Sequence, residues 1–199
     1  MPLISTFANG AARGYGMFQS SGAPYVLEGN YYALGTVTLS ATTSTVTFAG
    51  IPSNFKHLQV RYVARTDMNS GGAWSPIGLR FNSDSGANYD VHTLGSTGAS
   101  AFSEAYFSQT SASAGFGAPT TNTANSFGVG VIDIFDYQST TKNKVIRTLN
   151  GVDNNGSGLN VLQSSAWFST EAINSMTFRL LGGSNGSNYL ANTQFALYG

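Results

Sequence analysis

The sequence predicts an all-β protein: an antiparallel β-sandwich of jelly-roll type that follows an extended N-terminal arm. Three observations support this class. Apolar and polar residues alternate with a period of two in many short runs, each run ends in glycine, asparagine, serine or proline, and helical periodicity with capping residues is scarce. Such alternation is typical of strands that bury one face, and many such strands without intervening helices favour a sandwich or barrel. Strand number alone does not separate a jelly roll from an immunoglobulin-like sandwich.

Eight runs carry the alternation, in chain order. They are residues 35–40, 44–50, 57–66, 77–82, 127–137, 144–150, 176–182 and 194–199. In the third run Leu58, Val60 and Tyr62 share one face of an extended chain. Gln59 and Arg61 share the other face, which is the pattern of a strand with one solvated side. We therefore predict a strand for each run, with its apolar face turned to a common core.

Residues 1–30 and 31–199 differ in pattern, and we predict an arm followed by a domain. The first segment is broken by glycines between isolated aromatic residues, a composition that does not fold alone. Arg13, Tyr15 and Phe18 are its candidate docking residues, because sparse aromatic side chains on a flexible segment fill pockets when they become ordered. The alternative, left open, is a strap that lies across the chain's own domain.

Two further segments depart from the alternation. Residues 108–125 are rich in serine, threonine, alanine and glycine, with Phe116 as their one aromatic residue. They predict a long loop used for surface contact. Residues 168–176 offer one short turn of helix, because Ser169 and Thr170 can cap it.

Composition excludes several classes of function. Charged residues make up 9% of the chain, lysine plus arginine balance aspartate plus glutamate at nine each, and the basic residues do not cluster, so nucleic acid is not an expected partner. The chain has no cysteine, which excludes disulfides, thiolate metal sites and cysteine nucleophiles. No apolar run approaches the ~18 residues of a membrane span, and the first residues lack a signal-peptide pattern, so neither membrane insertion nor a leader is expected.

The stretch LRFNSDSGANYDVH, residues 79–92, gathers the most potential metal ligands. Asn82, Asp84 and Asn88 surround Gly86, but serine and glycine fall where a calcium loop needs ligands. The same residue types favour turns, because they tolerate left-handed backbone or bond to their own neighbours. We therefore predict a turn here, with no metal and no cofactor, and keep a weak cation site as the alternative.

Three groups of residues have the side-chain types of a catalytic site but not the spacing that catalysis requires. His92 lies two residues after Asp90, yet no nucleophile accompanies them. Ser184 in GGSNG matches a nucleophile elbow, but the chain returns to a strand pattern where that elbow needs a helix. Asp133 and Asp136 point to opposite faces of a strand, whereas a glycosidase needs two carboxyls on one sugar. No catalytic residue is therefore predicted.

Aromatic side chains are the remaining candidates for a binding platform: Trp74, Tyr89, Phe102, Tyr106, Phe107, Phe116, Tyr137 and Trp167. Trp74 and Phe116 lie among glycine, alanine and serine, where a ring has less core to join and can stack on sugar rings or on a partner. Trp167, in SSAWFST, is expected in the core instead. Trp74 and Phe116 are therefore the two candidate ligand-binding residues.

The order of four segments adds a resemblance. They read LGTVTLSATTSTVTFAGIPSNFKHLQVRYVART, IGLRFNSDSGANYDVHTLGSTG, FGVGVIDIFDYQSTTKNKVIRTLNGVDNNGSG and SSAWFSTEAINSMTFRLLGGSNGSNYLANTQFALYG, within residues 34–199. This order resembles a family of bacteriophage virion structural proteins related to tail fibres, and LRFNSDSGANYD, IDIFDYQSTTKNK and FALYG are its most specific parts. The arm segment GAARGYGMF is similar to N-terminal segments of phage tail and baseplate proteins.

The resemblance implies a jelly-roll β-sandwich, commonly trimeric, that serves in the virion without catalytic residues. We therefore expect a non-enzymatic tail-fibre or receptor-binding module, exposed on the particle, whose arm holds tail, baseplate or capsid proteins and whose domain contacts host surface glycan. Association of copies would bury strand edges and add avidity to weak glycan contacts. A head-spike, capsid decoration or cement protein is the second hypothesis, and a carbohydrate-active enzyme is the third.

Overall fold

The computed structural model describes residues 31–69, 72–182 and 188–199, and the regular secondary structure in these ranges is all β-strand. The strands are β1 (Ala33–Thr38), β2 (Thr45–Ala49), β3 (Leu58–Thr66), β4 (Ser75–Phe81), β5 (Tyr89–Ser96), β6 (Ala101–Gln109), β7 (Ala112–Pro119), β8 (Gly128–Phe135), β9 (Lys144–Asn154), β10 (Ser157–Trp167), β11 (Ser175–Leu180) and β12 (Gln194–Tyr198). Within the described ranges there is no helix with the length and hydropathy needed to cross a membrane.

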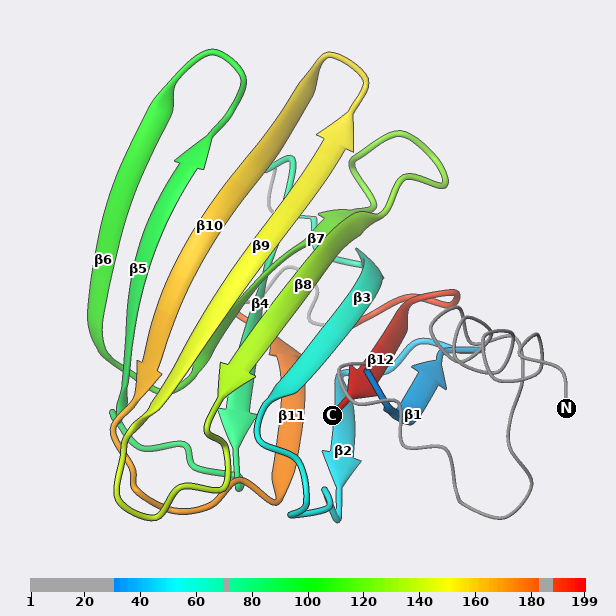
Figure 1. Ribbon diagram of the computed structural model, residues 1–199. Helices are drawn as coiled ribbons and strands as arrows, with labels where there is room; N and C mark the ends of the chain where they lie inside the picture. The colour runs from blue at the N-terminus through cyan, green and yellow to red at the C-terminus, as the bar shows by residue number, and fades with distance from the viewer. Residues whose placement is uncertain (1–30, 70–71, 183–187) are drawn as a thin grey trace, which may run out of the picture. The chain divides into compact units, whose positions relative to one another are not determined.

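The strands pair into one continuous mixed sheet. β6, β5, β10, β9, β8, β3, β12 and β1 pair antiparallel in that order, and we call them the front strands. β2, β11, β4 and β7 also pair antiparallel and are the back strands. The two sets join where β3 and β7 run parallel, with Arg65 opposite Ala118 and Thr66 opposite Pro119. Figure 1 shows β4 and β7 behind β8 and β9.

The hydrophobic core lies between the front and back strands, because both sets turn apolar side chains toward each other. Phe178 on β11 packs on Phe195 of β12 with ring centroids 4.7 Å apart, and Phe81 on β4 lies 5.5 Å from Trp167 on β10. Trp167 is 1% exposed, as the sequence predicts. Fully buried side chains of this size each contribute roughly 1.5–3 kcal/mol to folding.

The all-β class is confirmed, and each of the eight predicted runs overlaps a strand. The purely antiparallel arrangement is wrong, because β3 and β7 pair in parallel. The helical turn expected at residues 168–176 is absent from that described segment. The jelly-roll sandwich and the division into 1–30 and 31–199 stay predictions. Arg13, Tyr15 and Phe18 lie outside the described residues, so their docking role stays a prediction as well.

The loop predicted at residues 108–125 is wrong for most of its length, because β7 occupies Ala112–Pro119 and seven of its eight residues are buried, while residues 120–125 do lie in a loop, between β7 and β8. A strand buried on both faces does not alternate between apolar and polar residues. Its small residues reflect the close approach of neighbouring strands. A Cβ atom added at Gly128 of β8, for example, would lie 2.6 Å from the Phe116 carbonyl oxygen.

Candidate ligand-binding cleft

A cleft of about 630 Å³ opens between the front strands β5, β6 and β10 and the back strands β4 and β7. Aromatic rings line it from both sides. Trp74, just before β4, and Phe116 on β7 come from the back strands, while Phe102 and Tyr106 come from β6. The two aromatic residues predicted to bind ligand therefore line one cavity, and Phe116 does so from a strand instead of a loop.

The base of the cleft is polar and ordered. Gln163 on β10 donates from Nε2 to Thr93 Oγ1 at 3.2 Å and accepts at Oε1 from Ser113 Oγ at 2.9 Å. The three side chains are 3%, 6% and 7% exposed. An amide can make about four hydrogen bonds, and these two are the ones that Gln163 forms within the described residues. The base therefore presents amide and hydroxyl groups whose positions are already set.

Glu104 on β6 supplies the carboxylate of the cleft. The Tyr106 hydroxyl donates to Glu104 Oε2 at 2.9 Å. This hydrogen bond raises the pKa of Tyr106 above its ordinary value, because loss of the proton would set two negative charges side by side. Among the described residues that line the cleft, Glu104 is the one charged side chain. Glycoside hydrolysis needs a pair of carboxyls, and Glu104 supplies the one carboxyl among the described lining residues.

A β-bulge turns Phe116 into the cleft. β4 and β7 lose register between the pair Gly78–Ser113 and the pair Pro76–Phe116, where two residue steps on β4 oppose three on β7. Gly115 lies within this step and has a φ of 96°. Ser113 and Phe116, three residues apart, would point to opposite faces of a regular strand. The extra residue of the bulge lets both line the cleft.

Tyr62 on β3 fixes the backbone of Phe116. Its hydroxyl accepts from the Phe116 N–H at 3.1 Å and from Asn150 Nδ2 at 2.7 Å, and donates to the Phe116 carbonyl oxygen at 3.3 Å. Asn150 Nδ2 also donates to that carbonyl at 3.0 Å. Burial raises the pKa of Tyr62 well above its ordinary value, so the hydroxyl keeps its proton. The aromatic ring of Phe116 therefore extends from a rigid point of the core.

Trp74 is positioned through the loop between β7 and β8. Arg65 donates from its guanidinium to the Ser126 carbonyl oxygen at 2.6 Å, a charge-assisted bond that orders this loop. Asn122, in the same loop, donates from Nδ2 to the Ala73 carbonyl oxygen at 2.8 Å. The segment that carries the half-buried Trp74 is thereby tied to the domain.

The stretch at residues 79–92 forms the predicted turn, and the Asp84 N–H donates to the Phe81 carbonyl oxygen at 2.8 Å. The Asp84 carboxylate accepts from Trp167 Nε1 at 2.7 Å, from Asn88 Nδ2 at 2.9 Å and from the Gly86 N–H at 2.8 Å. These bonds hold the turn against the core. In the described part of the chain, no group of three or more histidine, aspartate or glutamate side chains is placed to hold a metal ion.

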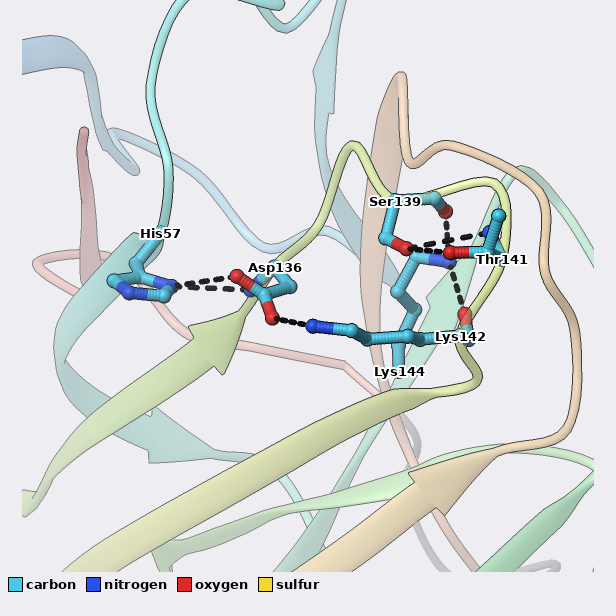
Figure 2. A network of polar contacts seen from close by, with 6 residues as sticks. All are labelled: His57, Asp136, Ser139, Thr141, Lys142 and Lys144. Atoms are coloured by element: carbon cyan, nitrogen blue, oxygen red, sulfur yellow. Dashed lines mark hydrogen bonds and ion pairs between the residues drawn. The ribbon is translucent and has the colours of Figure 1, made fainter.

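A second polar cluster surrounds Asp136, in the loop between β8 and β9 (Figure 2). Lys142 Nζ lies 2.8 Å from Asp136 Oδ2 and holds the pKa of Asp136 below its ordinary range. The Asp136 N–H donates to His57 Nδ1 at 3.0 Å. Lys144, fully buried, donates to the carbonyl oxygens of Ser139 at 2.7 Å and Lys142 at 2.9 Å, and burial lowers its pKa. The contacts brace the loop.

Among the described residues, the remaining catalytic candidates lie apart from one another. Asp133 accepts from Arg147 at 2.8 Å, so Asp133 and Asp136 pair with different cations. His92 is exposed on the side of β5 opposite to the cleft-lining Thr93. Ser184 lies outside the described residues.

Glu104 and Gln163 of the cleft were missed from the sequence, and Phe102 and Tyr106 were not singled out among its aromatic candidates. The signal that could have found Phe102, Glu104 and Tyr106 together is their spacing of two, which sets them on one face of a strand. It was obscured because most residues of β6 are exposed, so its two faces do not differ in polarity.

Comparison with known proteins adds no relative. No family model, no curated protein and no solved structure matches the chain.

Proposed function

We propose that this chain is a non-enzymatic structural protein of a bacteriophage particle that binds host surface glycan through the cleft. The observation that carries the proposal is the set of groups in the cleft: Trp74 and Phe116 face the same cavity as the aromatic residues of β6, above a base of amide and hydroxyl groups. Sugar rings present apolar C–H faces and a rim of hydroxyls. Stacking surfaces beside fixed hydrogen-bonding groups are the chemistry that recognises both.

The charge of the cleft favours a neutral glycan. Glu104 is the one charged residue among the described lining side chains, and its carboxylate is an acceptor for sugar hydroxyls. A glycan rich in carboxylate or phosphate would be repelled by it, and no lysine or arginine of the described lining would compensate.

In this proposal the β-domain is a jelly-roll module of tail-fibre type, exposed on the particle surface. Arg13, Tyr15 and Phe18 of the arm dock onto a tail, baseplate or capsid protein. Copies of the chain associate: the resemblance implies a trimer, whereas the outer face of the sheet, described in the next subsection, favours a pair. Association multiplies weak glycan contacts, which suits a single cleft of this size.

The test measures binding of the full chain to an array of immobilised bacterial surface polysaccharides, neutral and acidic. We expect binding to neutral polysaccharides, and Trp74→Ala and Phe116→Ala should each weaken it at least about tenfold, or ~1.4 kcal/mol. Phe168→Ala is the matched control, since this ring is 52% exposed and lies outside the cleft. Wild-type binding by both cleft variants would sink the proposal.

The competing functions give different results in the same series. A capsid decoration or cement protein would bind emptied phage heads and raise their heat resistance, with no response to Trp74→Ala. A carbohydrate-active enzyme would release reducing ends from a polysaccharide, and Asp133→Asn or Asp136→Asn would abolish that release.

A further inference from the structure

The outer face of the front strands is apolar where a solvated sheet face is ordinarily polar. Strands β8, β9, β10 and β5 pair so that Val131, Leu149, Leu162 and Leu94 lie side by side, and we call these four residues the aliphatic row. Leu149, Leu162 and Leu94 are 63%, 46% and 59% exposed. The row crosses four strands without a polar residue.

Further exposed apolar residues lie on the same face. Val63 on β3 and Val129 on β8 pair directly and are 38% and 51% exposed. Seven of the eleven large apolar side chains that are exposed in the described residues lie on this face: Val63, Leu94, Phe107, Val129, Val145, Leu149 and Leu162. Val63, Val129 and the aliphatic row adjoin one another, whereas Arg147 separates Val145 from Leu149. An exposed apolar surface of this kind marks an interaction site.

Two of the charged residues beside the aliphatic row are already paired with each other, while Arg61, the cross-strand neighbour of Val131 on β3, donates to Gln59 Oε1 at 2.8 Å. Asp133 on β8 and Arg147 on β9 are cross-strand neighbours whose charged atoms lie 2.8 Å apart. Gln59 donates to the other oxygen of Asp133 at 2.8 Å. A partner that covers this pair therefore does not bury an uncompensated charge at Asp133 or Arg147, which would be the most costly part of desolvation.

We propose that this face binds the same face of a second copy of the chain. Strands β3, β8, β9, β10, β5 and β6 lie side by side in that order. These six strands span about 24 Å at the ordinary strand spacing, and strands of about nine residues are about 30 Å long. The face thus covers about 700 Å², close to the ~800 Å² that each partner contributes to a standard interface. Its apolar content fits a protein surface better than a sugar.

The face is complementary to itself under a two-fold axis parallel to the strands between β9 and β10. This operation sets Leu149 of one copy against Leu162 of the other, and Val131 against Leu94, because it reverses the strand order. In the adjacent cross-strand row it sets Asp133 against His92. Apolar groups meet apolar groups, and an acid meets a base.

The proposal is independent of glycan binding, because the cleft lies on the inner side of the same strands. Sedimentation equilibrium of the full chain over a range of concentrations tests it. We expect a reversible dimer. The double variant Leu149→Glu with Leu162→Glu should raise the dissociation constant of this dimer at least about tenfold. Thr45→Glu adds charge to an exposed position of β2 and is the control, which should dimerise as wild type. The pair Leu149→Thr with Leu162→Thr repeats the test with residues favoured in strands.

Cross-linking locates the contact. The chain has no cysteine, so introduced thiols are unique. A mixture of Leu149→Cys and Leu162→Cys proteins should give the mixed disulfide on mild oxidation far faster than either protein mixed with Thr45→Cys. A monomer at all concentrations, a trimer, or a dimer that persists in both double variants would each overturn the proposal.

Discussion

Several polar side chains of this protein form hydrogen bonds that hold the fold together, and Asp84 is the clearest case. Its carboxylate joins the turn after β4 to the indole of Trp167, a residue that is 1% exposed. A buried indole N–H left without an acceptor costs about 1–3 kcal/mol. Asp84, a candidate metal ligand in the sequence, therefore stabilises the core through its bond to Trp167.

Acid titration should reveal this role. The hydrogen bond from Trp167, followed by that from Asn88, holds the pKa of Asp84 below its unfolded value of 3.8. A depressed pKa contributes stability that is complete above the unfolded value and is lost as the pH falls through the folded value. We expect the free energy of unfolding to decrease between about pH 5 and about pH 2, and Asp84→Asn to remove part of that slope.

Urea denaturation at a series of pH values measures the slope. Asp153→Asn makes the same change of charge at an exposed position of β9 and serves as the control. Equal slopes for Asp84→Asn and the wild type would show that the turn carboxylate does not contribute to acid sensitivity.

At the scale of elements, strands with one apolar and one polar face could be predicted from the sequence, and the others could not. β3 keeps the alternation because its outer residues are mostly polar. β5 and β10 were not predicted because Leu94 and Leu162 place apolar residues on the solvent side as well. β7 is buried on both faces and β6 is exposed on both, so neither alternates.

The candidate site could be predicted only as two separate residues. Trp74 and Phe116 stand out because an aromatic ring among small residues has little local core to join. Their meeting in one cleft depends on the antiparallel pairing of β4 with β7 and on a one-residue bulge. These are long-range features that neither composition nor spacing contains.

The bulge in β7 gives a prediction at this scale. A Cβ atom on Gly115 would collide with the Tyr62 hydroxyl and lie 2.9 Å from the Asn150 Cβ, at a φ of 96°. Gly115→Ala should therefore destabilise the protein by about 1–3 kcal/mol and weaken glycan binding, because Phe116 moves with the bulge. Gly156→Ala is the matched control, since Gly156 has a φ of 102° and no atom within 4 Å of the added Cβ. Equal loss of stability in the two variants, measured by urea denaturation, would contradict the role of crowding at the bulge.

In the whole molecule, the two proposed binding surfaces lie on opposite faces of the same strands. Thr93 and Gln163 line the cleft, while their chain neighbours Leu94 and Leu162 belong to the aliphatic row. Because successive residues of a strand point to opposite sides, a pair formed through the outer face leaves both clefts open. A dimer would then carry two glycan sites on one rigid body.

If the aliphatic row holds two copies together, the dimer should bind a polysaccharide surface with an avidity that is lost when the row is changed. The wild type should dissociate from a polysaccharide-coated surface about 10²–10⁴-fold more slowly than Leu149→Glu with Leu162→Glu, because the second contact is intramolecular once the first has formed. Both proteins should bind a short soluble oligosaccharide with the same dissociation constant, since that ligand occupies one cleft at a time. Surface plasmon resonance on a polysaccharide chip and calorimetry with the oligosaccharide supply the two measurements. Equal dissociation from the chip would show that the pair does not engage both clefts, whereas a loss of soluble binding in the double variant would show that the two faces are not independent.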